Sequence, residues 1–254
     1  MTAGRLSAQS WGTNPLLNDF ANSYVKSLDE FMHRFNGEEL HPGIANADDA
    51  DVRKKSILTL FDWQGFSDQD TVKAAAAVEF ADAVQKSGAT IGFTSPLMYA
   101  EAECLFKFKN KEIQLSLILK YENIRDDYYR WVIVGANGLE FEGFIDTARD
   151  GYINPVQNDL HFSDLRMAFP KLGRYLSKDG RVDQLSFIMG MAASGVLEFK
   201  GCQNVRYHFL DISGYIFTVG LHARLDNNAG WLIDNVMRAT HQQKEEYIKY
   251  LVGE

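Results

Sequence analysis

Cysteine and proline are scarce in this chain. Its 254 residues include only two cysteines, Cys104 and Cys202, which lie far apart and in none of the spacings of metal-binding or redox motifs. We therefore expect two reduced thiols that pack as small hydrophobic side chains. The chain has five prolines and no low-complexity run, which argues against long disordered segments.

Positive charge and long apolar runs are also lacking. There are 26 lysines and arginines against 34 aspartates and glutamates, a net charge of -8. Nucleic-acid binding is not expected, because a phosphate backbone binds clustered Lys and Arg. No stretch approaches the ~20 apolar residues of a membrane span, and residues 1–11 lack the apolar core of a secretory signal. We expect a cytoplasmic protein without a membrane partner.

The common motifs of nucleotide binding and hydrolysis are absent as well. The sequence contains no G-x-G-x-x-G, no G-x-x-x-x-G-K-[ST], no G-x-S-x-G and no histidine pair with metal-ligand spacing. The Gly-Ala-Asn-Gly run at 135–138 follows a predicted strand, but no helix follows it to present amides to a phosphate, so we interpret it as a turn. No cofactor or metal is expected.

What the chain does contain is the composition of a folded protein, with 46% hydrophobic and 24% charged residues. Apolar residues recur at helical spacing after Asn14-Pro15 and stop at Asn36-Gly37, which predicts a long N-terminal helix. Similar patterns predict further helices over 52–61, from a cap at 67–70 to Gly88, over 163–169, over 182–194 and over 240–251.

Alternating apolar and polar residues predict strands in both halves. In the clearest strand, 99–108, one face carries Ala100, Ala102 and Cys104 and the other carries Tyr99, Glu101 and Glu103. The other predicted strands cover 113–121, 128–133, 205–209, 215–221 and 231–236. Each half therefore has three strands that follow one another as an antiparallel meander.

The two halves repeat the same order of elements. A helix ending at Gly88 leads into strands that close on Trp131, and a helix ending at Gly195 leads into strands that close on Trp231. The fold predicted is α+β, with domains 1–147 and 148–254, each with helices packed on its own curved antiparallel sheet. Both tryptophans are predicted to lie in the core. The alternative is that any helix followed by a meander would give this pattern.

This order of elements resembles the nuclear-transport-factor-two-like cone-fold superfamily in two tandem copies. The segments FNGEEL at 35–40, YRW at 129–131 and YHFLD at 207–211 also resemble stretches of two-domain proteins from Bacteroides-type gut bacteria, a resemblance that implies no activity. The resemblance to the isomerases of the cone superfamily implies an aspartate that acts as the base, together with a tyrosine and an acid that form an oxyanion pair inside the cone. That trio has no residue-by-residue match in this sequence.

Two groups of residues are candidates for a site. Tyr99, Glu101 and Glu103 share one strand face, with the two carboxylates roughly 7 Å apart. If this face lines a cavity, burial should raise the pKa of one carboxylate and make it a general base; if it faces solvent, as Lys107 in the same phase suggests, it has no such role.

The second group is Tyr207, His208, His222 and Arg224, in which the histidines can transfer protons near neutral pH. The alternative is a set of satisfied polar groups at the surface or at a sheet edge.

Taken together, these features favour a non-enzymatic protein that binds a protein or a small-molecule ligand, as a monomer or a weak homodimer. The alternative is an isomerase-like or lyase-like enzyme that uses Glu101 or Glu103 as its base.

Overall fold

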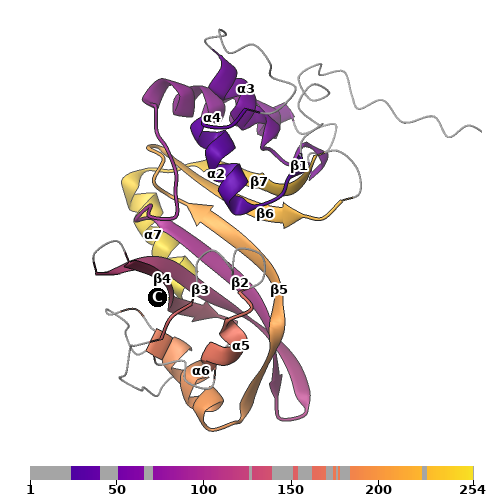
Figure 1. Cartoon of the computed structure of the whole chain (residues 1–254), viewed down its shortest axis with the longest axis vertical. Coiled ribbons are helices and arrows are strands. Elements are labelled where there is room, and N and C mark those ends of the chain that lie inside the picture. Colours follow the sequence, from indigo (N-terminus) through magenta and orange to yellow (C-terminus); the bar gives the residue numbers. More distant parts are fainter. Residues whose placement is uncertain are drawn as a thin grey trace, which may run out of the picture.

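The chain folds around one seven-stranded sheet flanked by helices (Figure 1). The computed structural model describes residues 24–40, 51–65, 71–125, 128–138, 151–153, 162–169, 174–175, 177, 184–224 and 228–253. The α+β class predicted from the sequence is confirmed. The strands are β1 (Tyr24–Val25), β2 (Met98–Phe108), β3 (Lys111–Arg125), β4 (Tyr128–Asn137), β5 (Leu197–Phe209), β6 (Tyr215–His222) and β7 (Ala229–Arg238). The helices are α2 (Leu28–Asn36), α3 (Val52–Thr59), α4 (Thr71–Ser87), α5 (Leu165–Ala168), α6 (Gln184–Ala193) and α7 (His241–Val252), with a 3₁₀ turn at Trp63–Gly65.

The N-terminal helix begins later than its apolar stripe predicts. Tyr24 and Val25 form β1, which pairs in parallel with β7, so the predicted helix is wrong over the described residues 24–27. The Ser27 side chain accepts a hydrogen bond from the backbone N–H of Glu30 at 3.1 Å and caps the helix there. Its end at Gly37, with φ of 78°, is confirmed. The part of the predicted helix before residue 24 lies outside the described residues.

The remaining helices lie close to where periodicity predicts them. α4 ends before Gly88, as predicted, while the proposed cap at 67–70 lies outside the described residues. α7 starts at a capping box in which Thr240 and Gln243 each satisfy the other's backbone N–H. In the described part of the chain, no helix combines the length and the apolarity that crossing a bilayer requires.

The strands of the two halves join into a single sheet, in which residues 135–137, interpreted from the sequence as part of a turn, continue β4 instead. Its order is β1-β7-β6-β5-β2-β3-β4, and β2 pairs with β5 antiparallel along its whole length. The expected separate sheets are therefore not found. Joining β2 to β5 removes two long, exposed edges, which is a physical reason for the continuous sheet. Residue 147, the predicted domain boundary, lies outside the described residues, so the division into domains stays a prediction.

The two meanders share an irregularity at equivalent places. In the β3–β4 pair the register skips one residue at Val134, and in the β6–β7 pair it skips one at Asp234, which is 100 positions later in the sequence. The residue pairs on both sides of the skipped residue also have numbers that differ by 100 between the two meanders. The same offset relates the pair Tyr121–Trp131 to the pair Leu221–Trp231. A bulge adds bend and twist, so both meanders curve at the same point.

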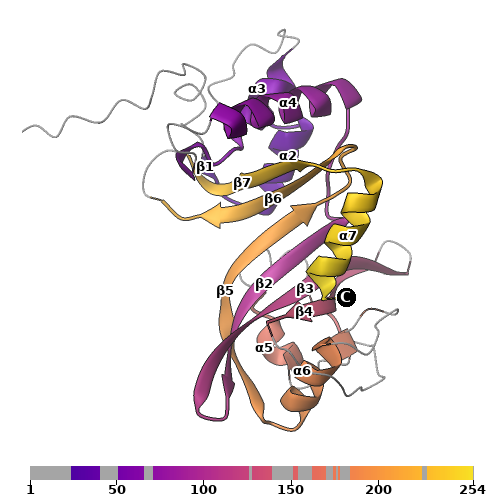
Figure 2. The same cartoon turned by 180° about the vertical axis from the view of Figure 1, so that it is seen from behind.

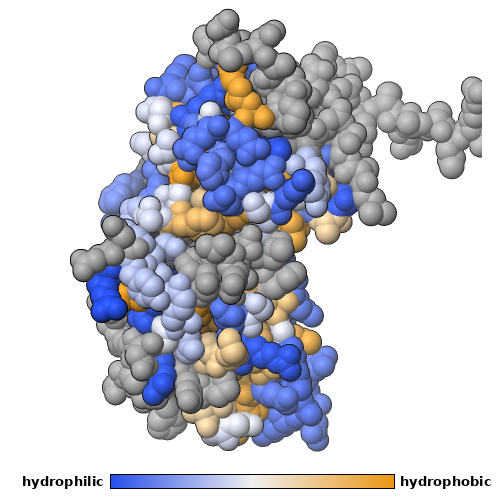
Figure 3. All heavy atoms as spheres, viewed as in Figure 1, coloured by the Kyte–Doolittle hydropathy of each residue, from blue (hydrophilic) through white to orange (hydrophobic). Residues whose placement is uncertain are grey.

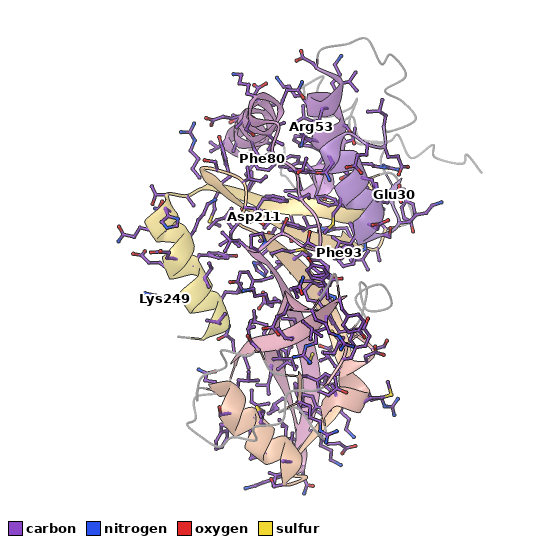
Figure 4. All side chains as sticks on the ribbon, turned by 60° about the vertical axis from the view of Figure 1, so that its left-hand side comes forward. Glu30, Arg53, Phe80, Phe93, Asp211 and Lys249 are labelled. Carbon is purple, nitrogen blue, oxygen red and sulfur yellow. The ribbon has the colours of Figure 1, made fainter. Side chains whose placement is uncertain are left out.

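The main core lies on one face of the sheet and is continuous through both halves. Helices cross between the halves: Phe80 of α4 contacts Phe217 of β6 at 5.2 Å between ring centroids, and α6 contacts β4 as well as β5. Figure 4 shows Phe80 between α4 and the strands. Trp131 and Trp231 are both fully buried, as predicted, and Tyr207 lies between them.

Helix α7 covers the opposite face of the sheet (Figure 2). A smaller apolar cluster that includes Ile118 and Leu251 holds it there. Its ends are tied by hydrogen bonds: Lys244 Nζ donates to the carbonyl of Leu210 at 2.6 Å, and Asn137 Nδ2 donates to the carbonyl of Leu251 at 2.7 Å. On the face drawn in Figure 3, the hydrophobic side chains among the coloured residues form small, separate patches.

Candidate functional site

A cleft of about 700 Å³ lies between α7 and the centre of the sheet. The alternation of β2 and β5 creates its floor, because residues of one phase enter the main core and those of the other phase point toward α7. β6, β7, β4 and α7 complete the walls. The lining residues are Glu101, Asn137, Arg206, His208, Thr218, His222, Asp234, Asn235, Tyr247, Tyr250 and Leu251.

Three side chains, Glu101, His208 and Tyr247, contact one another in a row across the cleft. His208 Nε2 lies 3.3 Å from Glu101 Oε2, and His208 Nδ1 lies 2.7 Å from the hydroxyl of Tyr247. The imidazole is held between the sheet and α7, with only 4% of its side chain exposed. The contact between Nδ1 and the phenol is a hydrogen bond, whereas Nε2 approaches the carboxylate without the geometry of one.

The electrostatic interactions among Glu101, His208 and Tyr247 determine whether the carboxylate and the phenol carry charge. The close approach of the His208 ring lowers the pKa of Glu101 and outweighs burial, which acts in the opposite direction. Burial raises the pKa of Tyr247 to about 12, with the Glu101 charge contributing. At neutral pH the carboxylate is therefore ionised and the phenol protonated. The hypothesis that burial raises the pKa of this carboxylate is wrong for Glu101, because the imidazole stabilises its charge.

Glu101→Gln should weaken the acid dependence of stability. The folded pKa of Glu101 lies below its unfolded value, so its contribution is present above the unfolded pKa and is lost as the pH falls through the folded pKa. We expect the variant to lose about 1 kcal/mol near pH ~7 and little near pH ~3. Urea unfolding at both pH values measures this. Glu103→Gln removes the same charge two residues along the strand and outside the cleft, so it is the matched control; equal behaviour of the two variants would contradict the assignment.

A second group of polar side chains, which carries no net charge, lies beside these three residues. Arg206 Nε donates to Asp234 Oδ2 at 3.1 Å, and the Thr218 hydroxyl donates to Asp234 Oδ1. Asp234 is the residue that the register skips in the β6–β7 pair, so the bulge turns it toward the cleft. Because the Arg206–Asp234 pair carries no net charge, the carboxylate of Glu101 gives the cleft lining a small net negative charge.

His222 forms the far wall of the cleft. Its Nδ1 lies 3.4 Å from Asp62 Oδ2, while Arg224 Nη1 donates to Asp62 Oδ1 at 2.7 Å. Burial lowers the pKa of His222, although Asp62 opposes this. Its Nε2 has no hydrogen-bond partner among the described residues. Next to it, Gly220 keeps the floor open, because a Cβ there would lie 3.0 Å from Asp234 Oδ2 and 3.5 Å from His222 Nε2.

The structure brings together three of the residues that the sequence singles out. Glu101, His208 and His222 line the cleft, although they come from two groups treated separately. Arg224 contacts this wall through Asp62 and His222. Glu103 lies on the same strand face, half-buried and outside the lining.

Two predicted site residues lie elsewhere. Tyr99 packs in the apolar cluster beneath α7, and Tyr207 faces the main core between the two tryptophans. Sequence reasoning missed Arg206, Asp234 and Tyr247. Arg206 shares the strand phase of His208, and helical periodicity predicts that Tyr247 faces inward on the C-terminal helix, so both had a local signal.

The described residues hold no group of three or more His, Cys, Asp or Glu side chains that could bind a metal ion. Comparisons with protein-family models, with curated proteins and with solved structures give no match. The function must therefore be argued from the geometry of the cleft.

Proposed function

We propose that this chain binds a small, neutral molecule rich in hydroxyl groups, of the sugar or polyol class, in the cleft between α7 and the sheet. The observation that carries the proposal is the mixture of donors and acceptors around about 700 Å³ of space. Carboxylates at Glu101 and Asp234, amides at Asn137 and Asn235, and the free Nε2 of His222 suit a ligand whose hydroxyls both donate and accept.

Two further features narrow the ligand class. The lining has two carboxylates against one guanidinium, which disfavours anions such as phosphate. At the rim, the Tyr250 ring is 79% exposed and offers an apolar face to the C–H face of a sugar ring.

The test is a titration of the full chain with D-glucose, D-ribose and myo-inositol, followed through the ring resonances of His208 and Tyr247 by NMR. At least one of these probes should shift both resonances with saturation, and inorganic phosphate should not. Gly220→Ala should weaken binding about tenfold or more, equivalent to about 1.4 kcal/mol, because its methyl group enters the floor.

Gly92→Ala is the matched control, since a Cβ there meets nothing within 4 Å, and it should bind as the wild type does. Saturable binding of phosphate without any response to the three polyols would overturn the proposed ligand class. Equal affinities for wild type and Gly220→Ala would remove the site from the cleft.

The enzymatic alternative is an isomerase-like or lyase-like activity with Glu101 as base. The contact chain Glu101–His208–Tyr247 favours it, because such a relay can move a proton, while the lowered pKa of Glu101 makes the carboxylate a weaker base. The same titrations in D₂O distinguish the two proposals. Deuterium entering the sugar at the carbon next to the carbonyl, and lost in Glu101→Gln, would favour the enzyme; binding without exchange favours the binding protein.

We also propose that the two halves are copies of one helix-plus-meander unit. The matching register skips at Val134 and Asp234, and the equivalent pairs around them, support duplication more directly than the order of elements does. The resemblance to tandem cone-fold domains, the cytoplasmic location and a monomeric or weakly dimeric state remain proposals alongside it.

A further inference from the structure

The two cysteines, 98 positions apart in the sequence, lie opposite each other in the sheet. Cys104 on β2 is the register partner of Cys202 on β5, between two register shifts of that strand pair. Both thiols face the main core: Cys104 is fully buried in it, and Cys202 is partly exposed and packs against it. This pairing joins the first half of the chain directly to the second.

The spacing of directly opposed residues suits a disulfide. Such residues in antiparallel strands have Cα atoms about 4.5–5.5 Å apart, within the roughly 4.4–6.8 Å that a disulfide spans. Both cysteines are free, and each thiol contacts a carbonyl two residues away on its own strand: Cys104 Sγ lies 3.3 Å from the Ala102 oxygen, and Cys202 Sγ lies 3.4 Å from the Asn204 oxygen.

The two thiols have unequal chemical environments. The interaction between the two thiols lowers the pKa of Cys202 and raises that of Cys104, whose burial raises it further. Cys202 is also the more exposed of the two. These differences are those between an attacking thiol, which must ionise and meet its partner, and a resolving thiol, which reacts from within the protein.

We propose that Cys104 and Cys202 are a redox modification site that forms a reversible intramolecular disulfide on reaction with a low-molecular-weight disulfide such as oxidised glutathione. The Cys202 thiolate attacks one glutathione sulfur, a protein–glutathione disulfide forms, and glutathione thiolate leaves and takes up a proton. Cys104 then loses its proton and attacks the Cys202 sulfur, releasing the second glutathione. Two cysteines are oxidised while one disulfide is reduced to two thiols.

The bond would fix the pairing of β2 with β5, the contact that unites the two halves of the sheet. These strands also carry Glu101 and His208, which lie three residues before Cys104 and six after Cys202. The modification does not depend on what the cleft binds. Its failure would therefore leave the proposed function untouched, and the reverse also holds.

Intact-mass measurement of the folded full chain after incubation with oxidised glutathione tests the site. The wild type should lose about 2 Da without any lasting adduct and regain them with dithiothreitol. Cys104→Ser should stop at the mixed disulfide, about 305 Da heavier, because the resolving thiol is missing. Cys202→Ser should react at least about tenfold more slowly, because Cys104 is buried.

Circular dichroism shows whether each variant is folded. If a variant is not, the mass of the wild type after mild urea treatment shows whether the disulfide forms in the folded or only in the unfolded protein. A folded wild type that keeps two free thiols, that accumulates the mixed disulfide, or that reacts only once unfolded would overturn the proposal. Disulfide-linked dimers in place of the internal bond would overturn it as well.

Discussion

Phe217→Ala is expected to lower the free energy of unfolding by about 3–5 kcal/mol. The side chain is fully buried on β6 and meets three other rings: Phe35 of α2 at 5.4 Å, Phe80 of α4 at 5.2 Å and Phe209 of β5 at 4.8 Å between centroids. Removing the ring loses its transfer free energy and leaves a cavity that two helices and a strand cannot all close. Urea unfolding followed by circular dichroism measures the loss.

Val72→Ala is the control, because this α4 side chain is 79% exposed and its loss should stay within about 0.5 kcal/mol. Phe80→Ala and the double variant complete a cycle. Since α4 of the first half packs on β6 of the second, the two phenylalanines should couple by more than about 0.5 kcal/mol. Strict additivity would contradict the contact between the halves.

Much of the secondary structure could be predicted because its signals are local. The alternation along 99–108 predicts β2 to within one residue. Glycines directly follow the ends of α2 and α4, and another follows shortly after the end of α6. The burial of Trp131 and Trp231 follows from their equivalent places in the two meanders. The strand and helix limits depend on neighbours within a few positions of the chain, whereas the burial of the two tryptophans follows from comparing the halves.

The arrangement of the halves could not be predicted, because strand pairing between distant segments leaves no local pattern. Nothing near Ala100 indicates that Tyr207 pairs with it, yet that pairing places Glu101 beside Arg206 and next to His208. The sequence therefore pointed to two separate candidate groups where the fold makes one cleft. The expected pKa of Glu101 had the wrong direction for the same reason, since its histidine partner lies on the other half.

Gly135→Ala is expected to release the C-terminal end of α7 and to lower the free energy of unfolding by about 3 kcal/mol. A Cβ at this position would lie 2.5 Å from the carbonyl oxygen and 2.6 Å from the Cα of Val252. Both are backbone atoms at the end of the helix, so relief requires the helix to move. Gly135 is not among the glycines with positive φ, so the added methyl group introduces the clash without backbone strain.

Hydrogen exchange of the α7 amides, with urea unfolding, measures this effect. Faster exchange should be concentrated in the last turns of α7, where Asn137 holds the Leu251 carbonyl, while Gly92→Ala exchanges as the wild type does. Unchanged protection of the helix would contradict the close approach. The other half offers a physical comparison: Asn235, the equivalent position on β7, carries a side chain that lines the cleft. The two equivalent strand positions therefore differ because of helix α7. Gly135 lies where the helix touches the sheet and leaves no room for a side chain, whereas Asn235 lies where the open cleft has room for a polar one.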